Sequence, residues 1–246
     1  MAAEFPDSLQ RVFAGVHRHP ALDNAFYVAW MRRRLPFEEV RTFARNYWAR
    51  TSHTASMVAL TIIGIPDVDV QSRVAENLYS EFGCGRAERS HIRLLGDFLI
   101  DLLSRLAGRV FTLRELLQLP VLPSTSDFSA AQRALYTADR PCCVLGAHLA
   151  QEWLAYSMLA KLYEGARRYR GLYPSIEAFH AHCEYFHAHI GETEKSHRHE
   201  AAQAARSVCK TEHDWAELAL AVDRFLEITA SFWKGLASAL PSLAVR

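Results

Sequence analysis

Residues 185–200 read YFHAHIGETEKSHRHE, and this stretch is rich in potential metal ligands. Six of the chain's twelve histidines fall between His180 and His199, and Glu192 and Glu194 follow Gly191 in the same stretch. Imidazole and carboxylate groups are the borderline ligands that hold iron, manganese or zinc in proteins. A histidine-rich tract is only a compositional signal, so a solvated helix face is an equally good interpretation of this stretch alone.

The sequence on either side indicates an all-α protein. Glycine and proline are sparse, with 11 and 9 residues, and they separate long segments of helical periodicity. Long helices, short connections and no repeat period favour a helical bundle, and 246 residues suit a single domain. Helices are expected over residues 6–16, 22–34, 37–63, 69–82, 88–106, 141–168, 174–208 and 212–239. Residues 119–130, LPVLPSTSDFSA, are expected to form a loop.

The composition excludes several classes of protein. A formal net charge of +1 gives no electrostatic footprint for nucleic acid or for an anionic membrane. No apolar run approaches the ~20 residues that span a bilayer, and the first residues lack the pattern of a signal peptide. The five cysteines are scattered without CxxC pairs, so neither a disulfide framework nor a cysteine zinc site is expected. We therefore expect a cytoplasmic protein with free thiols.

Residues 76–91, ENLYSEFGCGRAERSH, could supply metal ligands from other helices. Glu81 ends one expected helix, two glycines turn the chain, and His91 lies near the start of the next helix. Glu88 and His91 have the i, i+3 spacing that places a carboxylate beside an imidazole on one helix face. Alternatively, Glu88 only complements the helix dipole, and Glu81 is an ordinary exposed residue.

Glu152 lies in an almost wholly apolar helical segment, VLGAHLAQEWLAYSML, which covers residues 144–159. A carboxylate in such surroundings is costly unless it is paired or bound to a metal, so we expect Glu152 to be functional. His148, four residues earlier, could hydrogen-bond Glu152 and orient it as a ligand. The alternative is that His148 and Gln151 mark a solvated side of this helix.

His189, Glu194 and His197 do not share one face of a regular α-helix, which turns by about 100° per residue. One extra residue absorbed as a π-bulge would bring all three onto one face, and such bulges concentrate at functional sites. Gly191 lies where that distortion is cheap. Glu192 is an alternative acid. A rival set that needs no bulge consists of His180, Glu184 and His187.

Taken together, these segments resemble the heme-oxygenase-like diiron oxidases, helical proteins that share an architecture with heme oxygenase and thiaminase II. Residues 19–48, HPALDNAFYVAWMRRRLPFEEVRTFARNYW, resemble the first helices of that superfamily. Residues 76–91 resemble a segment of the family that supplies a glutamate and a histidine. Residues 151–165, QEWLAYSMLAKLYEG, are similar to its middle helix, which supplies one glutamate. Residues 185–197 resemble its final segment, in which an aromatic pair precedes a histidine, an acid and a second histidine.

The resemblance implies an O2-dependent enzyme with two iron ions. The implied ligands are Glu81, His91, Glu152, His189, Glu194 and His197. The implied reaction is oxidative carbon–carbon cleavage, decarboxylation or N-oxygenation of a small metabolite, such as an amino-acid or fatty-acid derivative. The final segment departs from the commonest family pattern by one residue, so Glu192 stays an alternative to Glu194. Glu88 likewise stays an alternative to Glu81, and manganese an alternative to iron.

Two other functions stay open. A metal-free hydrolase or oxidase of the thiaminase II type would use a cysteine nucleophile, for which Cys142 or Cys143 could serve. A non-catalytic interaction module would need no site at all. The oxidase prediction leaves room for an external electron donor and for a homodimer.

Six further residues, most of them aromatic, could line a substrate cavity: Tyr47, Trp48, His53, Tyr79, Trp153 and Tyr156. In a helical bundle such residues are more often part of the ordinary core. Arg45, Arg50 and Arg86 could hold a substrate carboxylate, but surface charge is the commoner role of arginine.

Overall fold

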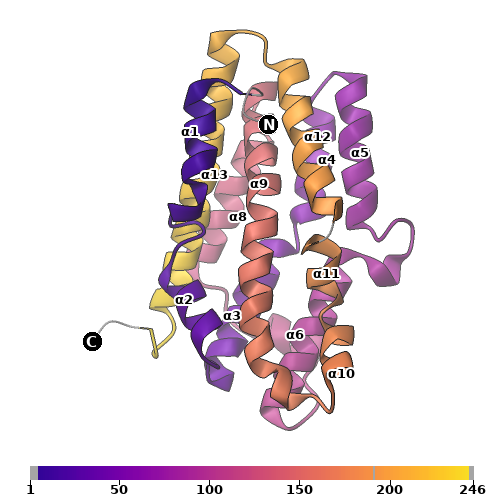
Figure 1. Cartoon of the computed structure of the whole chain (residues 1–246), viewed down its shortest axis with the longest axis vertical. Helices are drawn as coiled ribbons and strands as arrows, with labels where there is room; N and C mark the ends of the chain where they lie inside the picture. The colour runs from indigo at the N-terminus through magenta and orange to yellow at the C-terminus, as the bar shows by residue number, and fades with distance from the viewer. Residues whose placement is uncertain (1–4, 191, 244–246) are drawn as a thin grey trace.

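The computed structural model describes residues 5–190 and 192–243, without the side chains of Ser8, His189 and residues 192–196. These residues form helices and turns with no β-strand among them, which confirms the predicted all-α fold. The long helices run side by side as one elongated bundle (Figure 1). No helix in the described part of the chain is long and apolar enough to cross a membrane.

The helices follow one another through short connections, and η marks a 3₁₀ segment. Their bounds are α1 (Asp7–Gly15), η1 (Val16–Arg18), α2 (Ala25–Arg32), α3 (Phe37–Thr51), α4 (Thr54–Gly64), α5 (Val68–Glu81), η2 (Ala87–Arg89), α6 (His91–Ala107), α7 (Leu113–Gln118), α8 (Pro123–Tyr136), α9 (Pro141–Ala166), η3 (Arg167–Leu172), α10 (Ile176–His182), α11 (Glu184–Ile190), α12 (Glu192–Val208) and α13 (Glu212–Ser238).

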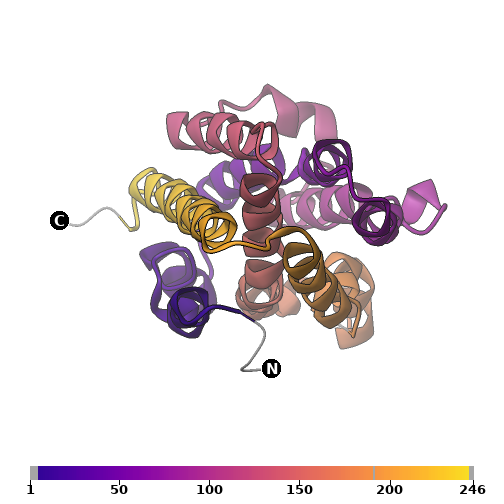
Figure 2. The same ribbon diagram turned by 90° about the horizontal axis from the view of Figure 1, so that it is seen from above.

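Helix α9 lies in the middle of the bundle, as the view from above shows (Figure 2). It packs against α2, α4, α8, α11, α12 and α13, and most of its side chains are buried, as expected of a central helix. Two glycines permit this packing. A Cβ at Gly165 would lie 1.8 Å from Cδ1 of Trp30, and one at Gly146 would lie 2.5 Å from the Leu218 carbonyl oxygen.

The prediction of one helix over residues 37–63 is wrong, because the chain breaks between α3 and α4. His53 has φ −101° and ψ 0°, which lies in the sparsely populated bridge region outside the helical range. The Ser52 hydroxyl donates to the Ala49 carbonyl at 3.3 Å, a local bond that competes with the helical ladder. The break exposes the N-terminus of α4 beside the last turn of α3.

The predicted loop over residues 119–130 is also wrong, since most of it belongs to α8. Pro123 occupies the first turn, where a missing N–H costs nothing. Asn46 of α3, which is fully buried, accepts hydrogen bonds from Leu122 N at 2.8 Å and from Thr125 Oγ1 at 2.7 Å. The start of α8 is therefore fixed by a partner from a distant segment.

The predicted helix over residues 174–208 is divided at Cys183 into α10 and α11. The structure places α11 up to Ile190 and α12 from Glu192 onward, while Gly191 lies outside the described residues. The π-bulge predicted between His189 and His197 therefore stays a prediction. Elsewhere α5, α9 and α13 match their predicted ranges to within two residues, but α6 begins at His91, three residues after the predicted start.

Candidate metal centre

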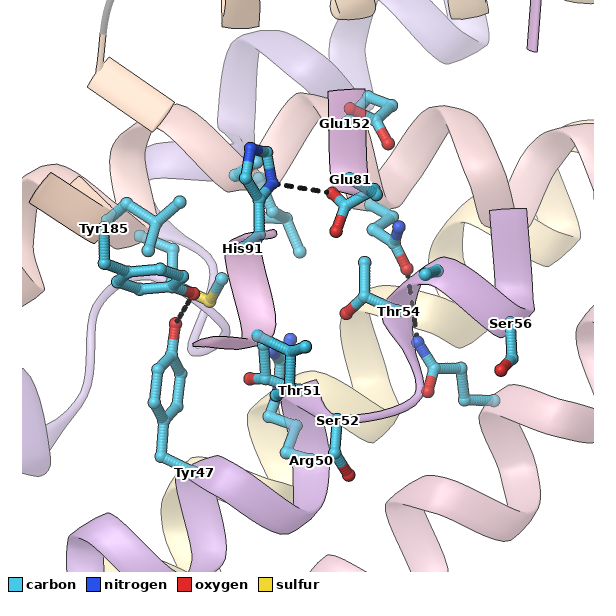
Figure 3. Close-up of a pocket in the computed structure, with 18 of the residues that line it drawn as sticks. Tyr47, Arg50, Thr51, Ser52, Thr54, Ser56, Glu81, His91, Glu152 and Tyr185 are labelled. Carbon is cyan, nitrogen blue, oxygen red and sulfur yellow. Dashed lines mark hydrogen bonds and ion pairs between the residues drawn. The ribbon is translucent and has the colours of Figure 1, made fainter. Parts of the chain in front are cut away.

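Glu81 and His91 meet across the turn between α5 and α6. The His91 Nδ1 atom lies 3.2 Å from the Glu81 Oε1 atom, and both side chains are largely buried (Figure 3). Gly83 makes this possible with φ +70°, since a Cβ there would lie 2.4 Å from the Arg86 carbonyl oxygen. The turn thus joins the last residue of α5 to the first residue of α6.

Glu152 lies near the middle of α9 and is only 6% exposed. One carboxylate oxygen is 3.9 Å from His148 Nδ1, and the other is 3.9 Å from His197 Nδ1 of α12. Burial, and next the neighbouring Glu81 carboxylate, raises the pKa of Glu152 to about 7. The protein therefore holds Glu152 in a poorly solvated place close to a second carboxylate, which disfavours the ionisation of Glu152.

The neighbouring imidazoles are held neutral. Burial, and next the charge of His197, lowers the pKa of His148 to about 4. Burial also lowers the pKa of His197. The Nδ1 atom of His148 is buried without a hydrogen-bond partner in the described part of the chain. Neutral imidazole is the form that binds a metal ion, so the protonation states suit coordination.

The residues present fit a metal site by their chemistry. Glu81, His91, Glu152 and His197 come from four helices, α5, α6, α9 and α12, and offer carboxylate and imidazole donors. A divalent cation would offset the repulsion that raises the pKa of Glu152. Among the described side chains, however, no three histidine, cysteine, aspartate or glutamate residues are arranged to hold an ion as they stand.

The other predicted ligands cannot be placed in the same way. The side chains of His189 and Glu194 lie outside the described residues, as does that of the alternative acid Glu192. Their predicted roles therefore stay predictions. His197, the last of the predicted ligands, is 7% exposed and sits beside Glu152.

The rival candidates lie away from this cluster. Glu88 is exposed on η2 and not on α6, so it lacks the helical spacing to His91 that the sequence predicts. His180 and His187 are exposed and stack on each other, with ring centroids 5.5 Å apart. Glu184 forms an ion pair with Arg89 at the surface. Neither Glu88 nor the rival set of His180, Glu184 and His187 therefore lies beside Glu81 and Glu152.

A cavity of about 190 Å³ adjoins Glu81, His91 and Glu152, which form part of its wall (Figure 3). Near them the hydroxyl groups of Tyr47 and Tyr185 are 3.1 Å apart, and burial raises the pKa of both phenols. Apolar residues of α9 form another wall: Leu154, Ala155, Met158 and Leu159.

Of the six residues predicted as cavity lining or core, only Tyr47 lines this cavity. Trp153 stacks on Phe13 with ring centroids 3.9 Å apart. Trp48 lines a separate hollow beside Glu88. The remaining three are exposed: His53, Tyr79 and Tyr156.

The structure does not support a cysteine nucleophile. The Cys142 and Cys143 side chains are not among the residues that line this cavity, and burial raises the pKa of both thiols. Cys142 is buried and lies 2.7 Å, sulfur to sulfur, from Cys209. A nucleophilic cysteine needs a lowered pKa and access, so these thiols are poor candidates.

Solved structures with the same overall architecture are known. A TenA homolog from Pseudomonas syringae pv. tomato DC3000 has a TM-score of 0.74 and 15% identity, over 96% of this chain and 95% of that one. A CADD-like protein of unknown function from Nostoc punctiforme PCC 73102 has a TM-score of 0.71 and 16% identity, over 95% and 96% of the two chains. A domain of unknown function with a heme oxygenase-like fold from Shewanella denitrificans OS217 has a TM-score of 0.68 and 17% identity, over 93% and 90%.

Identities this low show the fold alone, and they confirm the predicted heme oxygenase-like fold. No sequence among curated proteins matches the chain. A family model described as iron-containing redox enzyme matches residues 41–230, which include α4 to α12 and every residue of the cluster. With its helical bundle, its buried carboxylates and imidazoles and this match, the chain belongs to the family of iron-containing redox enzymes.

Proposed function

We propose that this protein is a non-heme diiron enzyme that uses O2 to oxidise a small metabolite. The observation that carries the proposal is the convergence of four potential metal ligands. Glu81, His91 and Glu152 line one cavity, and His197 lies beside Glu152. Membership of an iron-containing redox family supports iron as the metal. The use of two ions and of O2 rests on the donor set and on the resemblance to the diiron oxidases.

The residues that would hold the two ions are the four clustered side chains together with His189 and Glu194. Three carboxylates and three imidazoles are a suitable set for two irons that keep positions open for O2. Bound iron would supply the redox chemistry. The chain itself buries the ligands, keeps His148 and His197 neutral and presents a small cavity to the substrate.

The size of the cavity limits the substrate. Its volume of about 190 Å³ is below the roughly 300 Å³ at which pockets for drug-sized ligands begin. We therefore propose a small amino-acid or fatty-acid derivative. Because O2 accepts four electrons on the way to water, an oxygenation that takes two from the substrate needs an external donor for the others. The proposal therefore includes such a donor, and it leaves room for a homodimer.

The test is to load metal-free protein anaerobically with Fe(II), then add O2 and follow both oxygen consumption and visible absorption. We expect uptake of O2 with a transient absorption band, and faster decay of that band with the right substrate. His91→Ala should abolish both signals. His187→Ala is the matched control, because that histidine is exposed and belongs to the rejected rival set. Equal signals from His91→Ala and wild type would contradict the proposal.

A further inference from the structure

Arg50, in the last turn of α3, is a buried cation that lines the cavity (Figure 3). It is only 8% exposed, and its guanidinium carbon lies 4.7 Å from the ring centre of Phe128 and 5.5 Å from that of Phe232. Within the described residues its buried Nε atom has no hydrogen-bond partner. In that same part of the chain no carboxylate lies at ion-pair distance from it, unlike Arg105 with Asp101 or Arg140 with Glu217.

A buried guanidinium beside a cavity is expected to bind an anion. Arginine stays protonated in proteins and carries five N–H donors, so burial without acceptors is expensive. The two phenylalanine rings offset part of that expense through cation–π contact, but they accept no conventional hydrogen bond. Leaving one buried charge without its partner is strongly destabilising. A protein that keeps such a charge beside a cavity is suited to receive the partner from a ligand.

The N-terminus of α4 adds a second anion-binding feature to the same cavity. Thr54, Ala55 and Ser56, the first three residues of this 11-residue helix, line the cavity together with Arg50. The N-cap residue His53 makes no side-chain capping hydrogen bond. The first N–H groups of a helix have no partner within it, and the aligned peptide dipoles favour negative charge there.

We propose that Arg50 and the N-terminus of α4 bind the carboxylate of a small organic acid, which is the substrate. This inference rests on the proposed function, since it takes the cluster of Glu81, His91 and Glu152 as the reacting end of the cavity. The apolar body of the acid would then lie along Leu154, Met158 and Leu159 of α9.

A carboxylate suits the site better than a phosphate does. One guanidinium matches one carboxylate in a planar two-point contact. A phosphate monoester brings nearly two negative charges into a cavity that already contains Glu81 and Glu152. Hydroxyl groups of Thr51 and Thr54 line the same end of the cavity and can donate to carboxylate oxygens (Figure 3).

Calorimetric titration of the metal-free protein tests the proposal, with hexanoate compared against its neutral analogue hexanamide. We expect hexanoate to bind about tenfold to a hundredfold more tightly, which is the range for hydrogen bonds to a charged group. Arg50→Gln should lose that preference. Arg50→Lys should keep part of it, because it retains the charge but not the two-point contact. Arg41→Gln on the same helix is the control, because Arg41 does not line the cavity.

Equal binding of hexanoate and hexanamide by wild type, or no binding of either, would overturn the proposal. So would an unchanged preference in Arg50→Gln. Tight Arg50-dependent binding of inorganic phosphate with no binding of hexanoate would overturn the assignment to carboxylates. If Arg50→Gln does not fold, the comparison of the two ligands on wild type and on Arg50→Lys decides. Because no iron is present, failure here is distinct from failure of the iron and O2 experiment.

Discussion

Buried polar side chains in this protein differ in whether the fold provides their partners. Asn46 is fully buried and accepts hydrogen bonds from the start of α8, while its amide donates to the Thr42 carbonyl at 2.8 Å. Arg50 and Glu152 are similarly buried, but Arg50 lacks an acid among the described residues and Glu152 sits near a second carboxylate. A buried side chain whose partners are all provided by the fold, like Asn46, stabilises the protein. Buried charges without such partners, like Arg50 and Glu152, are expected where a ligand or an ion completes the site.

Asn46→Ala should therefore be costly to stability. It removes the acceptor of the Leu122 N–H and the Thr125 hydroxyl, and buried donors left without a partner cost about 1–3 kcal/mol each. We expect the free energy of unfolding in urea to fall by about 2–6 kcal/mol. Asn24→Ala is the matched control. Asn24 caps α2 and also donates to the Pro20 carbonyl in an exposed hydrogen bond, so its loss should cost about 1 kcal/mol. Equal losses for the two variants would contradict this role of Asn46.

The cysteines give a residue-scale test between the oxidase and a thiaminase-like enzyme. Burial raises the pKa of Cys143, so its thiol is a weak nucleophile at neutral pH. Cys143→Ser should consume O2 after iron loading at a rate within about twofold of wild type, because the substitution is small and leaves the cavity lining intact. Loss of activity in Cys143→Ser, with iron content unchanged, would favour the cysteine mechanism.

At the scale of elements, the turn from α5 to α6 sets the spacing of Glu81 and His91. Gly83, Cys84 and Gly85 all have positive φ, with 70°, 54° and 84°. Such a run of left-handed residues reverses the chain in a few positions, which is why two residues ten apart in sequence meet at 3.2 Å. The position of the Glu81–His91 pair is therefore built into the backbone of the turn.

Gly83→Ala should disturb that pair. An added methyl group would meet the Arg86 carbonyl oxygen at 2.4 Å and the Arg89 carbonyl carbon at 2.6 Å. Gly108→Ala is the control, since Gly108 also has positive φ but an added methyl group would meet no described atom within 4 Å. The control should cost about 1–2 kcal/mol from left-handed strain alone. Gly83→Ala should cost more in urea unfolding and should weaken Fe(II) binding. Wild-type iron affinity in Gly83→Ala would refute this account of the turn.

The sequence predicts most helices but not where they break. Apolar periodicity with proline and glycine boundaries locates α5, α9 and α13 to within two residues. The break at Ser52 and His53 has no glycine or proline, and the start of α8 depends on Asn46 from a distant helix. Both therefore depend on tertiary context that local pattern does not contain.

The candidate site is likewise predictable from the sequence only where local pattern reveals it. Glu152 stands out because a carboxylate in an apolar helix needs an explanation, and Glu81 with His91 follows from the glycine turn. For Arg50 the sequence favours surface charge, because its burial depends on Phe128 and Phe232 from α8 and α13. The structural feature that points to Arg50 as a ligand-binding residue is the helix break between Thr51 and Thr54. This break places the N-terminus of α4 at the same cavity as Arg50.

At the scale of the whole molecule, the bundle brings the candidate ligands together from four helices, α5, α6, α9 and α12. Helix α12 packs against both α5 and α9, so His197 comes from a helix that contacts the helices of Glu81 and Glu152. A metal bound among them would join these helices in the native state and not in the unfolded chain. Ligand binding of this kind raises the stability of the whole fold.

Fe(II) should therefore raise the thermal midpoint of unfolding under anaerobic conditions. At a free concentration of about 100 times the dissociation constant, binding contributes about 2.7 kcal/mol. For a chain of this length that corresponds to a rise of about 5–10 °C. Mg²⁺ should give a smaller shift, because a site rich in imidazole disfavours it. An equal rise for His91→Ala and wild type would show that iron binds elsewhere.

We propose above that Glu81, His91, Glu152 and His197 belong to a two-iron site. Iron content per chain tests it most directly, measured after anaerobic Fe(II) loading and removal of free metal. We expect about two irons per wild-type chain, a marked loss in His91→Ala and in Glu152→Ala, and no loss in His187→Ala. Iron near zero in wild type, or content unchanged by His91→Ala and Glu152→Ala, would contradict it.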